Sequence, residues 1–170
     1  MRALFLIDCW EQKWIDDTSP LGTNKFYDSM IEYLKDKTYD FIFFYDHNND
    51  GYSTHSIFKE RFPNYIHLDQ PDRKEGELPQ HDLLERMSRY LNKGDSILIG
   101  GNGFNNCLCD GPYSFYTFFD IEYLKIFSCP EVVDSYITTE EKITKDHFLN
   151  HKRINWQETD NYFEMIGYDE

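Results

Sequence analysis

The sequence predicts a three-layer α/β/α sandwich built on a mainly parallel, Rossmann-like sheet. Short apolar runs such as Ala3–Ile7 and Ser96–Ile99 have the length of strands and the continuous hydrophobicity of strands buried on both faces. These runs alternate with segments whose apolar residues recur at helical spacing. The 170 residues contain no linker, repeat or low-complexity tract. We therefore expect a single domain over residues 1–170.

Three strands and one helix are expected in the first half of the chain. Ala3–Ile7 is the first strand, and the others are Tyr39–Tyr45 and Tyr65–Leu68. Thr23 or Asn24 is the expected N-cap of the helix. The apolar residues of this helix follow at helical spacing: Phe26, Met30, Ile31 and Leu34.

The second half alternates in the same way, with strands at Ser96–Ile99 and Leu124–Phe127. Helices are expected over Tyr113–Phe119 and from Thr138, where Thr138–Glu141 has capping-box chemistry. Two C-terminal segments are compatible with either strand or helix: Ile154–Trp156 and Tyr162–Ile166. The clearest helix precedes Asn92–Gly94, and one apolar stripe defines it: Leu83, Leu84, Met87, Tyr90 and Leu91.

Composition excludes several classes of protein. The chain has 31 acidic against 17 basic residues, a formal charge of −14, so it lacks the basic footprint of a nucleic-acid binder. No apolar stretch is long enough to span a membrane, and the N-terminus predicts a first strand rather than a signal peptide. Four cysteines without disulfide or zinc spacing favour a reducing cytoplasm. The aromatic content of 18% favours self-association, so a homo-oligomer is expected.

The most distinctive stretch is the glycine-rich turn between Ser96–Ile99 and Cys107. Gly101 and Gly103 permit backbone conformations and close approaches that a side chain prevents. In open α/β sheets, ligands bind beyond the carboxyl ends of strands, where Cys107 would lie. The alternative is a structural turn followed by a buried cysteine, because free cysteines are among the most buried residues.

This turn and two other segments resemble the isochorismatase-like cysteine hydrolases, which include nicotinamidases. The matching segments are Ala3–Asp8, Tyr45–His47 and Ile99–Leu108, and Lys74 precedes Cys107 at about the family's distance. The resemblance implies an isochorismatase-like domain in which Cys107 is the nucleophile. Asp8 would be its general base, and Lys74 the cation that favours the thiolate. It also implies a cis peptide bond in the turn, at Gly101–Asn102.

The implied activity is hydrolysis of a small-molecule amide, carbamoyl or related bond, with no cofactor required. Backbone N–H groups of Gly101, Asn102 and Gly103 are candidate donors to the tetrahedral oxyanion. The candidate substrate contacts are aromatic: Trp10, Trp14 and Phe104. The two tryptophans are equally compatible with a place in the core or at an interface.

A divalent metal is the second chemistry considered. The resemblance implies a nicotinamidase-type metal site among Asp46, His47 and His55. Asp46-x-Asn48-x-Asp50-Gly51 also matches the first half of a calcium loop, but Ile57 stands at the twelfth position, where a carboxylate is required. A polar turn without a metal is the third interpretation.

Two other functions compete with the hydrolase. Trp10 stands where the family usually has glutamine, and Gly111-Pro112 interrupts the expected helix after Cys107. These departures favour a catalytically degenerate domain that binds a protein partner through its acidic, aromatic surface. A metal-dependent nuclease of the NYN/PIN type also has an acid after its first strand. It requires another after the fourth, where this chain has Asn102 and Asn105.

Overall fold

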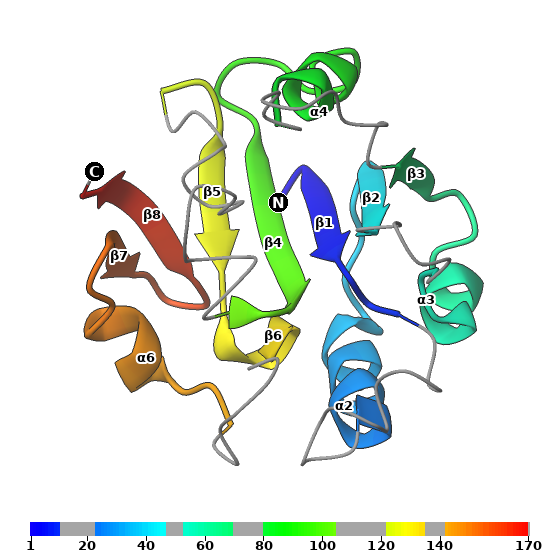
Figure 1. The fold of residues 1–170 in the computed structure, drawn as a ribbon, viewed down its shortest axis with the longest axis horizontal. Helices are drawn as coiled ribbons and strands as arrows, with labels where there is room; N and C mark the ends of the chain where they lie inside the picture. The colour runs from blue at the N-terminus through cyan, green and yellow to red at the C-terminus, as the bar shows by residue number, and fades with distance from the viewer. Residues whose placement is uncertain (11–22, 47–52, 70–79, 105–121, 135–141, 170) are drawn as a thin grey trace, which may run out of the picture.

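The computed structural model describes residues 1–10, 23–46, 53–69, 80–104, 122–134 and 142–169 (Figure 1). Its centre is a mixed sheet in the order β3-β2-β1-β4-β5-β8-β7, with β6 pairing beside β4. The strands of the parallel part are β1 (Ala3–Ile7), β2 (Phe41–Asp46), β3 (Ile66–Asp69), β4 (Ser96–Asn102), β5 (Lys125–Ser128) and β6 (Val133–Asp134). This confirms the predicted α/β class.

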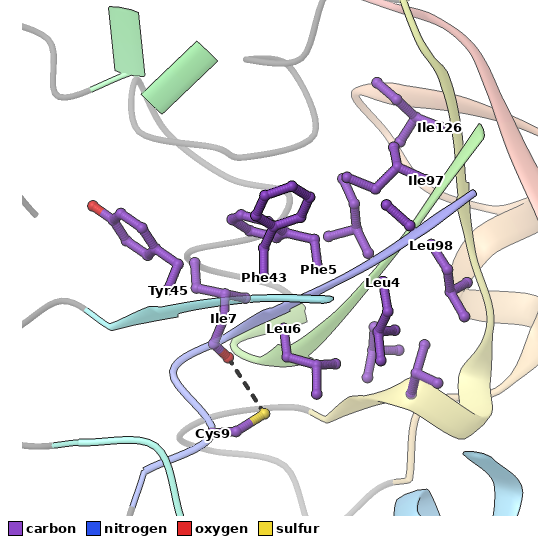
Figure 2. Packing of buried hydrophobic residues seen from close by; sticks show 14 of the residues in the cluster. Leu4, Phe5, Leu6, Ile7, Cys9, Phe43, Tyr45, Ile97, Leu98 and Ile126 are labelled. Atoms are coloured by element: carbon purple, nitrogen blue, oxygen red, sulfur yellow. Dashed lines mark hydrogen bonds between the residues drawn. The ribbon is translucent and has the colours of Figure 1, made fainter. Parts of the chain in front are cut away.

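The middle strand of the parallel part is β1, which pairs with β2 on one side and β4 on the other. All five of its residues are buried, as expected of a strand covered on both faces. Figure 2 shows the alternation, with Leu4 and Leu6 on one side of the strands and Phe5 and Phe43 on the other. The side chains of β1 therefore contribute to both apolar layers of a three-layer sandwich, one on each face of the sheet.

The C-terminal segments that the sequence left undecided form two strands, β7 (Ile154–Glu158) and β8 (Phe163–Tyr168). They pair antiparallel with each other, and β8 pairs antiparallel with β5. Burial alternates along this hairpin, since Ile154, Trp156, Phe163 and Met165 are buried and the residues between them are more exposed. The hairpin adds an antiparallel edge to the predicted parallel sheet.

Four helices are described: α2 (Thr23–Leu34), α3 (Ser56–Arg61), α4 (Gln80–Met87) and α6 (Lys145–Leu149). The predicted stripes are buried at Met30 and Leu34 of α2 and at Leu83 and Met87 of α4. A 3-10 turn, η2 (Pro130–Val132), separates β5 from β6. None of the helices within the described ranges is long and apolar enough to cross a bilayer.

The described helices differ from the predicted ones in two places. Residues 142–144 are not helical, and α6 begins only at Lys145, where Thr144 and His147 form a capping box. α3 was not predicted, because its six residues are too few to show helical periodicity; its N-cap is His55. The helix expected over Tyr113–Phe119 and the start expected at Thr138 lie outside the described residues.

A close approach of two backbones joins β1 to β4. At Gly101, φ is +119°, and a Cβ atom there would lie 2.0 Å from the carbonyl oxygen of Ile7. No side chain fits at that distance, so the two strands would have to separate. The glycine is therefore required by the pairing of β1 with β4.

We predict that Gly101→Ala lowers the free energy of unfolding by about 3 kcal/mol or more, because it adds a backbone clash to an unfavourable φ. The matched control is Gly94→Ala, whose φ is +89° but whose Cβ would meet nothing within 4 Å. Its expected cost is about 1–2 kcal/mol, from the backbone conformation alone. Urea unfolding of both variants checks the difference, and equal losses would contradict the role assigned to Gly101.

The Tyr39 hydroxyl is buried and has no hydrogen-bond partner among the described residues. Burying a hydroxyl without a partner is unfavourable, so we predict that Tyr39→Phe stabilises the fold by about 1 kcal/mol. Tyr33→Phe is the control, because the Tyr33 hydroxyl accepts a hydrogen bond from Cys129 Sγ, and this variant should be less stable than wild type. Thermal unfolding of both variants measures their changes in stability, which should have opposite signs.

Candidate active site

The strand order places a topological switch point between β1 and β4. From β1 the chain continues to β2 and β3 on one side of the sheet, then crosses to β4 and β5 on the other. Ligands of open α/β sheets bind at the carboxyl ends of the strands beside such a point. Here the residues that follow these ends are Asp8 after β1, and Asn102 and Gly103 at the end of β4. They form the candidate active site.

Asp8 lies directly beyond the last pair of the β1–β4 ladder, in which Ile7 is opposite Gly101. The residue is 1% exposed and has a φ of +51°, in the left-handed region that non-glycine residues seldom occupy. Its N–H donates to the carbonyl of Tyr45 at 2.8 Å. A strained, buried carboxylate at a strand end is a common feature of functional sites.

Asn102 holds the Asp8 backbone in this conformation. Its side-chain amide donates to the carbonyl oxygen of Asp8 at 2.5 Å and to the hydroxyl oxygen of Tyr27 at 3.0 Å. Tyr27 is fully buried on α2, and its pKa is raised by burial first and then by the neighbouring Cys9. Tyr27 is therefore a neutral hydrogen-bonding group. It joins α2 to the ends of both central strands.

Asp46, at the end of β2, is fully buried and makes several hydrogen bonds. Thr54 donates to its carboxylate from both the backbone N–H, at 3.1 Å, and the hydroxyl, at 3.0 Å. His67 Nε2 lies 3.0 Å from the same carboxylate. These bonds tie β2 to β3 and to the segment before α3, so Asp46 has a structural role here.

Asp134 is an acidic residue of this sheet edge that sequence reasoning missed. It is buried at the end of β6, where it pairs with Asn102 of β4. Its signal in the sequence was an apolar pair, Val132-Val133, followed by an acid, the same pattern as at Asp8. The segment was overlooked because β6 has only two residues.

The Cys9 thiol lies among these carboxylates. It is completely buried and donates to the Ile7 carbonyl at 3.8 Å (Figure 2). Burial raises the pKa of this thiol well above its usual value, and the charges of Asp46, Asp8 and Asp134 raise it further. Cys9 is therefore held in the thiol form and is not a nucleophile.

Several predicted site residues lie outside the described residues: Lys74, Cys107, Trp14 and His47. Among the described candidates, the Gly103 N–H donates to the carbonyl of Asp134 at 3.1 Å. It is therefore not available to an oxyanion, which corrects that part of the prediction. The Gly101–Asn102 peptide bond is trans, since no cis bond occurs in the described ranges. The cis bond implied by the resemblance is thus absent.

Two aromatic candidates for substrate contact are packed in the core. Phe104 is fully buried, with its ring centroid 4.8 Å from that of Phe148 on α6. Trp10 is 6% exposed and forms an isolated antiparallel bridge with Thr54. Their packing explains why hydrophobic residues occupy these positions. Their contact with a substrate remains a prediction.

The metal prediction also remains a prediction. His55 Nδ1 accepts a hydrogen bond from the N–H of Ile57 at 3.1 Å and so caps α3. Within the described ranges, no three side chains of His, Cys, Asp or Glu come together closely enough to hold a metal ion. Two of the three predicted metal ligands, Asp46 and His55, are among the described residues. Asp46 accepts hydrogen bonds from Thr54, and His55 accepts one from Ile57.

Comparison of the chain with protein-family models, with curated proteins and with solved structures found no match. The interpretation of the site therefore depends on its geometry and chemistry.

We predict that Cys9 and Cys129 resist alkylation by iodoacetamide at neutral pH in the folded protein. Burial raises the pKa of Cys129 to about 12 and that of Cys9 well above its usual value. For Cys129, the thiolate fraction falls roughly a thousandfold relative to an ordinary thiol. Peptide mapping after brief labelling measures each site. Labelling of Cys129 should rise as the pH is raised, and all four cysteines should react after denaturation. Rapid labelling of Cys9 in the folded state would contradict the buried environment described here.

Proposed function

We propose that this protein is a cysteine-dependent hydrolase of a small-molecule amide, carbamoyl or related bond. Cys107 is the nucleophile, Asp8 its general base and Lys74 the cation that stabilises the thiolate. The proposal requires no cofactor, and it includes a cytoplasmic location and self-association of the chain. It joins the observed geometry around Asp8 to the sequence pattern around Cys107.

The observation that carries the proposal is the position of Asp8 at the switch point. Ile7 pairs with Gly101, so Asp8 is beside the end of β4. Cys107 follows Asn102 by five residues along the chain. A chain of that length spans at most about 18 Å, so the proposal requires Cys107 to lie within that distance of Asn102, at the same edge of the sheet. The proposal therefore pairs the carboxylate of Asp8 as base with the thiol of Cys107 as nucleophile.

In the proposed reaction, the Cys107 sulfur attacks the carbonyl carbon of the substrate and its proton passes to Asp8. The resulting tetrahedral oxyanion collapses and breaks the carbon–nitrogen bond, and the proton from Asp8 is transferred to the departing amine. A thioester remains on Cys107. Water, deprotonated by Asp8, then hydrolyses the thioester and restores the thiol. Asn102 contributes by fixing the backbone of the base, because it bonds the Asp8 carbonyl.

Asp134 is the specific observation that favours a second candidate, the metal-dependent nuclease. It supplies an acid beside Asn102, where the sequence had shown none. The net charge of −14 opposes nucleic-acid binding, and it equally suits the third candidate, an acidic module that binds a protein. The hydrolase is preferred because it gives a role both to Asp8 at the switch point and to the cysteine that follows β4 along the chain. The three candidates differ in which residue is essential.

We predict that Cys107 is alkylated faster than Cys109 at neutral pH and that Asp8→Asn removes this selectivity. The full chain is then screened for ammonia release from small primary amides. Cys107→Ser and Asp8→Asn should each lower hydrolysis by roughly 10²–10⁴-fold, because each removes a group that takes part in bond breaking. EDTA should have no effect on the rate.

The control variant is Asp36→Asn, which removes a carboxylate that is exposed in the turn after α2. It should leave both labelling and hydrolysis unchanged. Equal labelling of Cys107 and Cys109 would exclude the nucleophile. Hydrolysis of nucleic acid that is lost with EDTA or in Asp134→Asn would instead establish the metal-dependent nuclease.

A further inference from the structure

A hollow that does not include Asp8, Asn102 or Gly103 is lined in part by Pro130 and Glu131 of η2. It has a volume of about 330 Å³ and is bordered by the end of α2, the junction of β5 with η2, and the turn between β7 and β8. None of its lining residues belongs to the predicted catalytic or metal sets. The volume is at the lower end of the range for ligand sites, so it suits a small molecule. The residues used below are Tyr33, Lys37, Cys129, Glu131, Asp160 and Tyr162.

Uncharged hydrogen-bonding groups form one part of its wall. The Cys129 thiol donates to the Tyr33 hydroxyl at 3.5 Å, and Tyr162 lines the same hollow. Burial raises the pKa of all three groups, that of Cys129 to about 12. At neutral pH this part of the wall therefore carries no charge. It offers aromatic rings and hydroxyl oxygens to a ligand.

Charged groups surround this neutral wall, and acids outnumber bases among them. Lys145 Nζ lies 2.9 Å from Glu158 Oε1, so these two charges compensate each other. The remaining charged groups of the lining are two acids, Glu131 and Asp160, and one base, Lys37. The chain as a whole has a charge of −14, which attracts cations to its surface.

The ammonium group of Lys37 shows which ligand chemistry the wall accepts. Its Nζ lies over the ring of Tyr33, 4.3 Å from the ring centroid. This is a cation–π contact, in which the negative face of the ring attracts a positive charge. The Lys37 side chain is half-buried, and its ammonium group is at the end of a flexible four-carbon stem. Another cation can therefore replace this ammonium group over the Tyr33 ring.

We propose that this hollow binds a small organic amine, whose ammonium group displaces that of Lys37 from the Tyr33 ring. The carboxylate of Glu131 pairs with the ammonium, and the Tyr162 hydroxyl accepts a hydrogen bond from it. Lys37 acts as an internal competitor that occupies the ring when the amine is absent. The site is independent of the hydrolase chemistry at Asp8.

The test uses three molecules of equal length, n-butylammonium, butyrate and 1-butanol, titrated into the full chain and followed by the NMR signals of Tyr33 and Tyr162. We expect n-butylammonium to bind with a dissociation constant in the millimolar range or tighter, and the other two more weakly. Glu131→Gln should weaken n-butylammonium binding roughly tenfold. Glu85→Gln, an exposed acid on α4, is the control and should change nothing.

The change in n-butylammonium affinity caused by Lys37→Met distinguishes the two possible roles of Lys37. If Lys37 competes with the amine, its removal tightens n-butylammonium binding several-fold. If Lys37 instead recognises a carboxylate, butyrate binds better than n-butylammonium to the wild type and loses its affinity in Lys37→Met, which overturns the proposal. The absence of any change at Tyr33 and Tyr162 with n-butylammonium also overturns it. Thermal unfolding of each variant verifies the fold, and because no step depends on Cys107, the result is separate from that of the hydrolase test.

Discussion

The structure depends on the close pairing of β1 with β4 at Gly101. A backbone without a side chain at this position lets the carbonyl of Ile7 approach to a distance that a Cβ would obstruct. The pairing makes β1 the middle of the parallel part of the sheet and buries all its side chains. It also creates the switch point, because the two strands whose connections run in opposite directions become neighbours. The core and the candidate active site thus share one constraint.

The sheet edge beyond this pairing is unusually acidic for a buried place. Asp8, Asp46 and Asp134 are all buried there, and their charges together raise the pKa of the Cys9 thiol. Burying carboxylates is costly unless they are hydrogen-bonded. Asp46 shows how the fold meets this cost, since Thr54 and His67 surround it. Asp8 has a related arrangement at the backbone, where Asn102 bonds its carbonyl and Tyr27 bonds Asn102. A network of neutral hydrogen-bonding groups, in which Asn102 donates to both the Asp8 carbonyl and the Tyr27 hydroxyl, therefore supports the position of the proposed base.

The hollow near Tyr33 follows from a different part of the chain. The hairpin of β7 and β8 joins the sheet through β5 and brings its turn, with Asp160 and Tyr162, beside the end of α2. α2 also carries Tyr27 toward the switch point, so one helix contributes side chains to both places. A ligand near Tyr33 and a substrate near Asp8 would thus contact the same helix.

The sequence alone determined the α/β class, the strands β1 to β5 and the position of Asp8 at a strand end, because continuous apolar runs and acids after them are local patterns. It did not determine the secondary structure of residues 154–168. Apolar residues spaced over such short segments are compatible with a strand or a helix, and only pairing with β5 distinguishes the two. Only the tertiary structure decided that Asp134 lies beside Asn102, that Phe104 packs on α6 and that the Gly103 N–H is already bonded. Each of these is a contact between segments distant along the chain. Such contacts leave no periodic signal in the sequence, because packing and hydrogen bonding depend on which surfaces the fold brings together.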